Sequence, residues 1–201
     1  MTLALWILAA YAMGSIPTSY LAGRIAGVDL RQQGSKNLGA TNVYRVLGWK
    51  YAVPTGLVDV AKGAIPVALF APRAGSESWI PMLIGVAAVL GHVFSIFLKF
   101  RGGKGVATAA GAVLALAPAA LGVSALVWIG VLLVSGYVSL ASILGALAFP
   151  VAVRLTDPED SYALGIGLAL VLFIIFTHRS NIRRLATGTE NRFGRRAKEQ
   201  A

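Results

Sequence analysis

The chain lacks cysteine altogether, and only 13% of its 201 residues are charged. The missing cysteine excludes disulfides and thiol chemistry. The two histidines, His92 and His178, lie far apart, so we expect no metal site and no other cofactor. Segments of alternating hydrophobicity about ten residues long are also missing, which argues against a membrane β-barrel. The chemistry of this chain must therefore use nitrogen and oxygen side chains.

Apolar sequence is abundant instead, with 57% hydrophobic residues and a mean hydropathy of +0.73. A soluble domain of this size carries about a quarter charged residues. Here the charges are confined to short segments between long apolar stretches, which is typical of a helical membrane protein. We therefore predict an all-α polytopic membrane protein with a single domain over residues 1–201. Since no Lys or Arg precedes Arg24, the first apolar stretch is predicted to stay as a transmembrane helix and not a signal peptide.

The net charge of +10 is unevenly distributed, and its distribution predicts the topology. Basic residues gather in segments 24–50, 99–104 and 178–201, whereas segment 73–78 is neutral and segment 154–160 is acidic. The positive-inside rule places the first three segments in the cytoplasm and the last two outside. This topogenic explanation accounts for the basic residues better than nucleic-acid binding does, so we expect no nucleic-acid partner.

The number of membrane spans follows from the same assignment. Four spans are predicted over about residues 3–21, 51–70, 80–98 and 161–177. Between Lys104 inside and Arg154 outside lie roughly 50 residues, too many for one crossing of a bilayer about 30 Å thick. Three short crossings, broken near Pro118 and Gly136, give a seven-transmembrane-helix bundle with the N-terminus outside and the C-terminus cytoplasmic. Five helices with a re-entrant segment is the alternative.

The first of three polar clusters covers residues 34–45, after the first predicted span. It combines glycine with hydroxyl, amide and cationic side chains, which suits it to hold phosphate. Its candidate ligands are Ser35, Lys36, Asn37, Thr41, Asn42 and Arg45. A short helix over residues 38–47, capped by Asn37 and closed by Gly48, would place Asn37, Thr41 and Arg45 on one face. The alternative is a solvated turn with capping residues.

The second cluster is the sequence Gly102-Gly103-Lys104-Gly105 at the start of an apolar stretch. Successive glycines allow the backbone N–H groups to point at one anion, while Lys104 and the helix N-terminus add positive charge. Because Gly105 follows Lys104 where a Walker A loop has Ser or Thr, this is not such a loop. The alternative is a positively charged tight turn that fixes topology.

The third cluster follows the last predicted span. His178 has a side chain suited to act as a base or a phosphate donor, and Asn181, Arg184 and Glu190 follow it. The remaining basic residues of this segment are predicted to anchor anionic lipid headgroups: Arg179, Arg183, Arg192, Arg195 and Arg196.

Three polar residues lie within the predicted spans. Asp59 and Lys62 are three residues apart, so we predict that they pair on one helix face. A structural role for this pair is favoured over a catalytic one. For His92, inside the third predicted span, a hydrogen bond between helices is the favoured interpretation.

Taken together, these clusters resemble the signature of the bacterial acyl-phosphate:glycerol-3-phosphate acyltransferase family, integral membrane enzymes that begin phospholipid synthesis. The resembling segments run in order along the chain: 14–17, 34–45, 59–63, 91–92, 100–108 and 178–190. The family's seven-helix arrangement with an outer N-terminus agrees with the parity count. Two positions depart from the family: Lys36 stands where we expect Gly, and Ser95 where we expect Pro.

The resemblance implies transfer of a fatty acyl group from acyl phosphate to the 1-hydroxyl of glycerol 3-phosphate, without a cofactor. Such a reaction needs two anion sites, an oxyanion stabiliser and a base. We predict one phosphate on Gly102, Gly103, Lys104 and Gly105 with Thr108, and the other on Ser35 and Arg45 with Lys36, Asn37, Thr41 and Asn42 nearby. His178 and Asn181 would orient the reacting group. The base stays open between His178, Glu190 and the donor's own phosphate, and an acylated Ser35 is less favoured.

The predicted partners are acyl phosphate, glycerol 3-phosphate and membrane lipids, with functional coupling to the enzyme that makes acyl phosphate. The predicted location is the bacterial inner membrane, with all three clusters converging in one site on the cytoplasmic side. A transporter for an organic phosphate is one alternative, and a scaffold that recruits anionic lipid is another. Transporters usually show repeat symmetry and polar groups near the midplane, and neither pattern is found here.

Overall fold

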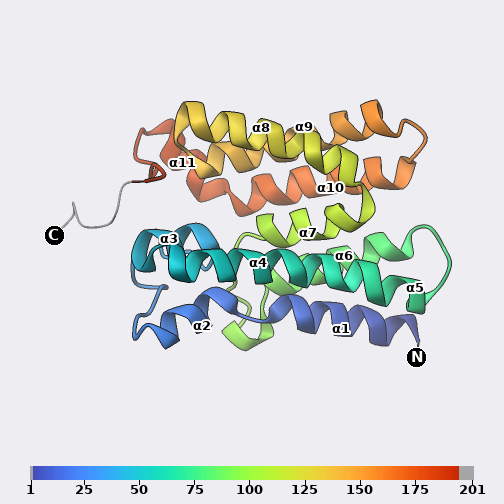
Figure 1. The fold of residues 1–201 in the computed structure, drawn as a ribbon, viewed down its shortest axis with the longest axis horizontal. Coiled ribbons are helices and arrows are strands. Elements are labelled where there is room, and N and C mark those ends of the chain that lie inside the picture. The colour runs from blue at the N-terminus through green and yellow to red at the C-terminus, as the bar shows by residue number, and fades with distance from the viewer. Residues whose placement is uncertain (1, 195–201) are drawn as a thin grey trace. The chain divides into compact units, whose positions relative to one another are not determined.

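Figure 1 shows the fold in a computed structural model that describes residues 2–194. Every regular element in this range is helical, which confirms the all-α prediction. The chain divides after residue 115 into two compact units, here unit 1 (residues 2–115) and unit 2 (residues 116–194). Each is described by itself, and the single-domain prediction stays a prediction.

Unit 1 begins with a broken span. The helices α1 (Leu3–Ser15) and α2 (Thr18–Ile25) are separated at Ile16-Pro17, where Ile16 leaves the helical conformation with a ψ of 118°. Pro17 causes this break because proline lacks an N–H and disfavours helical geometry in the residue before it. The predicted span over residues 3–21 is therefore two helices within one apolar stretch.

The rest of unit 1 follows the predicted order of spans. Its elements are α3 (Ala40–Leu47), α4 (Trp49–Ile65), the π-helical turn η1 (Pro66–Phe70), α5 (Ala71–Ala74), α6 (Ile80–Val93), the 3₁₀ turn η2 (Ile96–Leu98) and α7 (Val106–Leu116), whose last residue already belongs to unit 2. Glycines bring the helices close together, since a side chain at Gly14 would collide with the Ala88 backbone and one at Gly111 with the Val60 carbonyl. Small residues serve close helix contacts in this way in membranes.

Unit 2 contains α8 (Pro118–Ser135), α9 (Val138–Thr156), α10 (Ser161–Thr177) and α11 (Arg179–Ala186). The predicted breaks near Pro118 and Gly136 are confirmed. Pro118 is the first residue of α8, and Gly136 ends that helix with a φ of +72°, a conformation in which glycine is not strained. Asp160 caps α10 by accepting a hydrogen bond of 2.8 Å from the Ala163 N–H.

Five helical stretches among the described residues are long and apolar enough to cross a membrane: Leu3–Ile25, Trp49–Ala74, Ile80–Leu98, Pro118–Ser135 and Val138–Thr156. A sixth results if α10 and α11, bent by 62°, count as one. Helix α7 is apolar but has only 11 residues, about 16 Å of helix, short of the bilayer core. The membrane-helix prediction is thus confirmed, whereas the count of seven stays a prediction.

Candidate functional site

The loop before α3 is held in place by Asn42. Its side chain is 1% exposed, and its Oδ1 accepts a hydrogen bond of 2.7 Å from the Ser35 N–H. Its Nδ2 donates to the carbonyls of Leu30 at 3.2 Å and Gln33 at 3.1 Å. A side chain at Gly34 would collide with Asn42 Oδ1. Asn42, predicted to bind substrate, is therefore committed to shaping the loop that presents Ser35.

Lys36 follows with a φ of +60°, in the left-handed region. A residue with a side chain pays about 1 kcal/mol or more there, whereas glycine does not. This conformation accounts for the glycine expected at this position in the resembling family. The Lys36 side chain is exposed.

The predicted helix over residues 38–47 is present as α3, and it ends at Gly48 as predicted. The predicted cap is wrong: Gly39 is the N-cap residue, in an extended conformation, and no side chain caps the helix. Asn37 therefore precedes the helix and does not share a helical face with Thr41 and Arg45. Those two residues lie one turn apart on α3, each half-buried.

The hydrogen bonds of the glycine loop, residues 102–105, differ from the predicted ones. The N–H of Gly102 donates to the Val93 carbonyl at 2.9 Å, and the N–H of Gly103 donates to the His92 carbonyl at 3.2 Å. The prediction that these N–H groups point at an anion is therefore wrong. Glycine is needed here for close packing, because a side chain at Gly103 would collide with His92 Nε2 and with the Leu38 carbonyl.

Gly105 and Thr108, also predicted to bind phosphate, have surroundings that differ from the prediction. Gly105 has a φ of +82°, and its carbonyl accepts from the Ala109 N–H at 2.7 Å, which starts α7. Thr108 is fully buried, and its backbone packs against Gly63 of α4. That position argues against a phosphate contact for Thr108. The contact between Gly103 and Leu38 brings the first and second clusters together within unit 1.

A buried polar network lies beneath the glycine loop. Lys62 Nζ is 2.8 Å from Asp59 Oδ1, which confirms the predicted pair, and it also donates to the Ile16 carbonyl at 2.9 Å. Thr18 Oγ1 donates to Asp59 Oδ1 at 2.5 Å. His92 Nδ1 lies 3.6 Å from the same oxygen, so the hydrogen bond predicted for His92 is replaced by a longer contact between α4 and α6.

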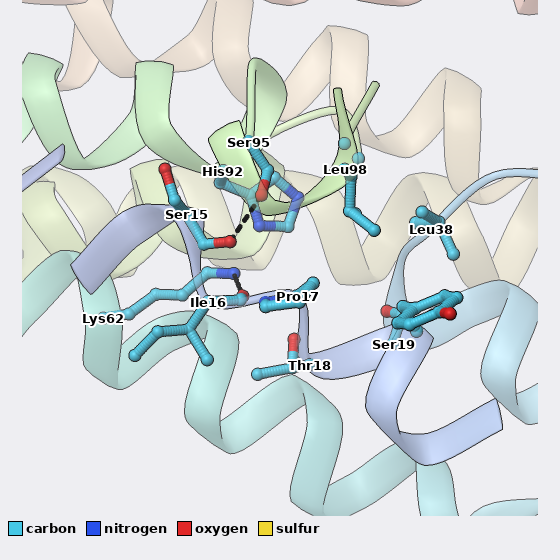
Figure 2. A pocket seen from close by; sticks show the side chains of 13 residues that line it. Ser15, Ile16, Pro17, Thr18, Ser19, Leu38, Lys62, His92, Ser95 and Leu98 are labelled. Carbon is cyan, nitrogen blue, oxygen red and sulfur yellow. Dashed lines mark hydrogen bonds between the residues drawn. The ribbon is translucent and has the colours of Figure 1, made fainter. Parts of the chain in front are cut away.

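Figure 2 shows a small pocket above this network, with about 210 Å³ of empty space including its open mouth. It is lined by the break between α1 and α2, by His92 and Lys62, and by Gly102 and Gly103 of the glycine loop. Ser95 Oγ closes one side by donating to the Ser15 carbonyl at 2.6 Å. Sequence reasoning missed Thr18, and it named Ser95 only as a departure from the resembling family. The local signal at each position is a helix end, since Thr18 begins α2 and Ser95 precedes η2.

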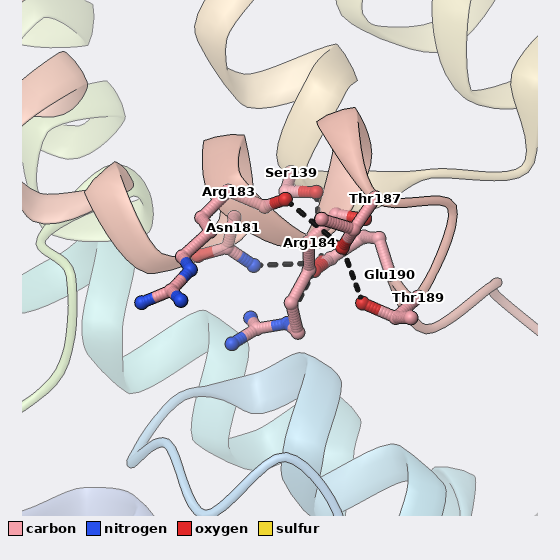
Figure 3. A network of polar contacts seen from close by, with 7 residues as sticks. All are labelled: Ser139, Asn181, Arg183, Arg184, Thr187, Thr189 and Glu190. Carbon is pink, nitrogen blue, oxygen red and sulfur yellow. Dashed lines mark hydrogen bonds and ion pairs between the residues drawn. The ribbon is translucent and has the colours of Figure 1, made fainter.

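In unit 2, Glu190 is the centre of the network drawn in Figure 3. Its side chain is 4% exposed and accepts from Asn181 Nδ2 at 2.7 Å, Arg184 Nε at 2.7 Å and Ser139 Oγ at 2.9 Å. Burial alone would raise the pKa of Glu190, but the hydrogen bonds from these donors outweigh it and hold the pKa below its usual range. An ionised carboxylate with three donors is a weak base, and its hydrogen bonds suit Glu190 to orient Asn181 and Arg184.

His178 stands at the bend between α10 and α11 and is 3% exposed. Its Nδ1 lies 2.9 Å from the Ile174 carbonyl. A carbonyl can only accept, so Nδ1 carries a proton, and in the neutral ring Nε2 is then the basic nitrogen. This geometry suits the predicted role of His178 as a base or an orienting group.

The segment after α11 returns to the turn between α8 and α9. The Phe193 N–H donates to the Gly136 carbonyl at 2.7 Å, and Arg192 Nε donates to the Tyr137 hydroxyl at 3.3 Å. Sequence reasoning missed Ser139 and Tyr137, because hydroxyls inside an apolar stretch carry no signal of their partner. Of the predicted lipid anchors, Arg195 and Arg196 lie outside the described residues. The convergence of this cluster with the first two stays a prediction.

Comparison with known proteins gives a match along almost the whole chain. The family model described as glycerol-3-phosphate acyltransferase matches residues 4–188. The chain is 46% identical over 185 residues to the glycerol-3-phosphate acyltransferase of Geobacter sulfurreducens, covering 92% of this chain and 94% of that one. It is 42% identical over 238 residues to that of Chlorobium luteolum, covering 98% and 100%.

Similar solved structures agree with this family match. The glycerol 3-phosphate form of PlsY (YgiH), an integral membrane glycerol 3-phosphate acyltransferase, is 42% identical with a TM-score of 0.89 and 96% of each chain covered. Its lysophosphatidic acid form is 41% identical with a TM-score of 0.87, covering 96% of this chain and 95% of that one.

Proposed function

The chain belongs to the glycerol-3-phosphate acyltransferase family, and we propose that it transfers a fatty acyl group from acyl phosphate to the 1-hydroxyl of glycerol 3-phosphate. The products are lysophosphatidic acid and inorganic phosphate. The observation that carries this proposal is the family match over residues 4–188. It is supported by similar structures solved in a glycerol 3-phosphate form and a lysophosphatidic acid form.

Acyl phosphate is the donor that suits this chain. The reaction joins the hydroxyl oxygen to the acyl carbon and breaks the bond from that carbon to the phosphate oxygen, so that phosphate leaves with the electron pair. Because phosphate is already a good leaving group, positioning and charge are the main requirements. The His-x-x-x-x-Asp motif of acyl-CoA-dependent acyltransferases is missing, since Phe97 and Arg183 stand at the fifth positions after His92 and His178.

The two phosphates are assigned to the first and second clusters. Arg45 offers a planar fork for a phosphate, with Ser35 and Asn37 as further donors and Lys36 and Thr41 beside them. Lys104 supplies the charge for the second phosphate. Gly102, Gly103 and Gly105 set the backbone path that presents Lys104. Asn42 sets the path that presents Ser35.

The proton of the attacking hydroxyl is assigned to His178 Nε2 or to the donor's own phosphate. The bond from Nδ1 to the Ile174 carbonyl leaves Nε2 as the basic nitrogen of the neutral ring. Asn181, oriented by Glu190, is the partner that would hold the reacting group. Neither role needs a covalent nucleophile.

The proposal includes a location. Seven spans with the N-terminus outside and the C-terminus in the cytoplasm would place all three clusters at the cytoplasmic face of the bacterial inner membrane. The basic segments named above support this orientation. There the chain would work beside the enzyme that makes acyl phosphate.

The test is an assay of the purified protein with palmitoyl phosphate and glycerol 3-phosphate, which is expected to yield lysophosphatidate and phosphate in equal amounts. Palmitoyl-CoA, run in parallel, is expected to be inactive, and product from palmitoyl-CoA alone would overturn the donor assignment. Flux of glycerol 3-phosphate into liposomes without any acylated product would favour the transporter instead.

A further inference from the structure

His92 is a buried titratable residue, 7% exposed, to which the proposed reaction assigns no role. Its backbone and its ring both face the glycine loop. The His92 carbonyl accepts from the Gly103 N–H, and the next carbonyl, of Val93, accepts from the Gly102 N–H. His92 Nε2 occupies the space that a side chain at Gly103 would need. The loop that presents Lys104 therefore rests on His92 through two independent contacts.

The other ring nitrogen of His92, Nδ1, faces the carboxylate of Asp59. Nδ1 lies 3.6 Å from Asp59 Oδ1, beyond hydrogen-bond distance but close enough for the ring to pack against the carboxylate. Asp59 is 1% exposed and is itself held by Thr18 and Lys62. The imidazole thus lies between the buried Asp59–Lys62 pair and the glycine loop. Figure 2 shows His92 and Lys62 facing the same pocket.

We propose that His92 is a positioning residue for Lys104. Its ring, held against Asp59, keeps Gly103 packed on the Leu38 carbonyl, the point at which the first and second clusters touch. A shift of the loop there changes the distance between Lys104 and the phosphate-binding residues of the first cluster. This inference rests on the proposed function, in which Lys104 holds a substrate phosphate.

Three variants distinguish the contact of Nε2 with Gly103 from the contact of Nδ1 with Asp59. His92→Gln can extend its amide nitrogen to the position of Nε2 beside Gly103, whereas His92→Asn reaches only the position of Nδ1 beside Asp59. His92→Leu fills space without any nitrogen. Ile84→Ala is the control, because Ile84 is fully buried in the same helix, in an apolar cluster that includes Ala10 and Ala71 and no residue of the glycine loop.

The assay measures kcat and KM for both substrates, with rates divided by the folded fraction from size-exclusion chromatography. His92→Gln is expected to keep kcat/KM within about threefold of the wild type. His92→Asn and His92→Leu are expected to lose about 10- to 100-fold, since a displacement of about 1 Å can cost that much. The KM should rise for the substrate whose phosphate Lys104 holds and stay unchanged for the other.

Unchanged kinetics per folded molecule in His92→Leu, or an equal loss in Ile84→Ala, would overturn the role of His92. If His92→Leu does not fold, the Asn and Gln variants decide, because they differ by one methylene and equal rates would contradict the proposal. A wild type that makes no lysophosphatidate from palmitoyl phosphate would overturn the proposed function, and the role of His92 with it. An active wild type with indifferent His92 variants removes only that role.

Discussion

The buried ion pair in α4 offers the sharpest test of what stabilises unit 1. In the Lys62→Met variant, Asp59 keeps its charge but loses the ammonium group 2.8 Å from its Oδ1. Both side chains are almost fully buried, 3% and 1% exposed, so little water reaches Asp59 to replace the lost partner. Removing one partner of a buried pair typically costs about 3–5 kcal/mol. The Ile16 carbonyl at the break between α1 and α2 loses its donor as well.

A change of this size is measurable by heating the protein in detergent. For a chain of about 200 residues, 1 kcal/mol corresponds to about 2–4 °C in Tm, so a decrease of roughly 6–20 °C is expected for Lys62→Met. The matched control is the double variant Asp59→Asn with Lys62→Met, in which no uncompensated charge remains. It is expected to regain most of the loss, because replacing both members of a buried pair is often close to neutral.

The result that would refute this reasoning is a Lys62→Met protein that melts within about 2 °C of the wild type. It would mean that Asp59 has access to water or another cation in the folded protein. A double variant no more stable than the single one would show that packing, and not the unpaired charge, causes the loss.

The remaining predictions concern the clusters themselves. Arg45→Lys should lower kcat/KM by about 10- to 100-fold in the acyl phosphate assay, since an ammonium group cannot copy the planar fork; near-normal rates would remove Arg45 from the site. Lys36→Gly should raise Tm slightly, because it relieves the positive φ at the cost of a more flexible unfolded chain; a lower Tm would contradict the strain. The folded pKa of Glu190 lies below its ordinary value, so its stabilisation is present above about pH 4.3 and is lost as pH falls through the folded pKa. Glu190→Gln should therefore melt lower than the wild type at pH 7 and lose less Tm on acidification; parallel Tm curves would refute this.

The sequence predicted best what depends on local signals. Pro118 marks the boundary between α7 and α8, and Gly136 marks the boundary between α8 and α9. Each residue acts through its own backbone, so the signal is local. Asp59 and Lys62 were paired correctly because their spacing of three brings them together on any helix. The prediction of an unbroken first span is wrong, although Pro17 carries the same kind of local signal as Pro118.

What the sequence could not predict depends on contacts between distant segments. The N–H groups of Gly102 and Gly103 were expected to hold an anion, yet they bond to carbonyls of α6, about ten residues away along the chain. The sequence predicts Asn42 as a ligand because amides bind phosphate, but its side chain donates to the carbonyls of its own loop. The hydrogen bond that Glu190 accepts from Ser139, some fifty residues earlier, could not be predicted either.

These corrections have a common direction that fits the proposed chemistry. An activated donor such as acyl phosphate needs accurate placement of charge more than a strong base, so buried polar groups serve best when they hold loops. Asn42 fixes the loop of Ser35, His92 lies beneath the loop of Lys104, and Glu190 aims Asn181. In each case a buried side chain fixes the position of a more accessible loop or of a polar neighbour. We therefore expect variants of these three residues to lower turnover through the geometry of their neighbours, with losses that conservative replacements such as His92→Gln partly restore.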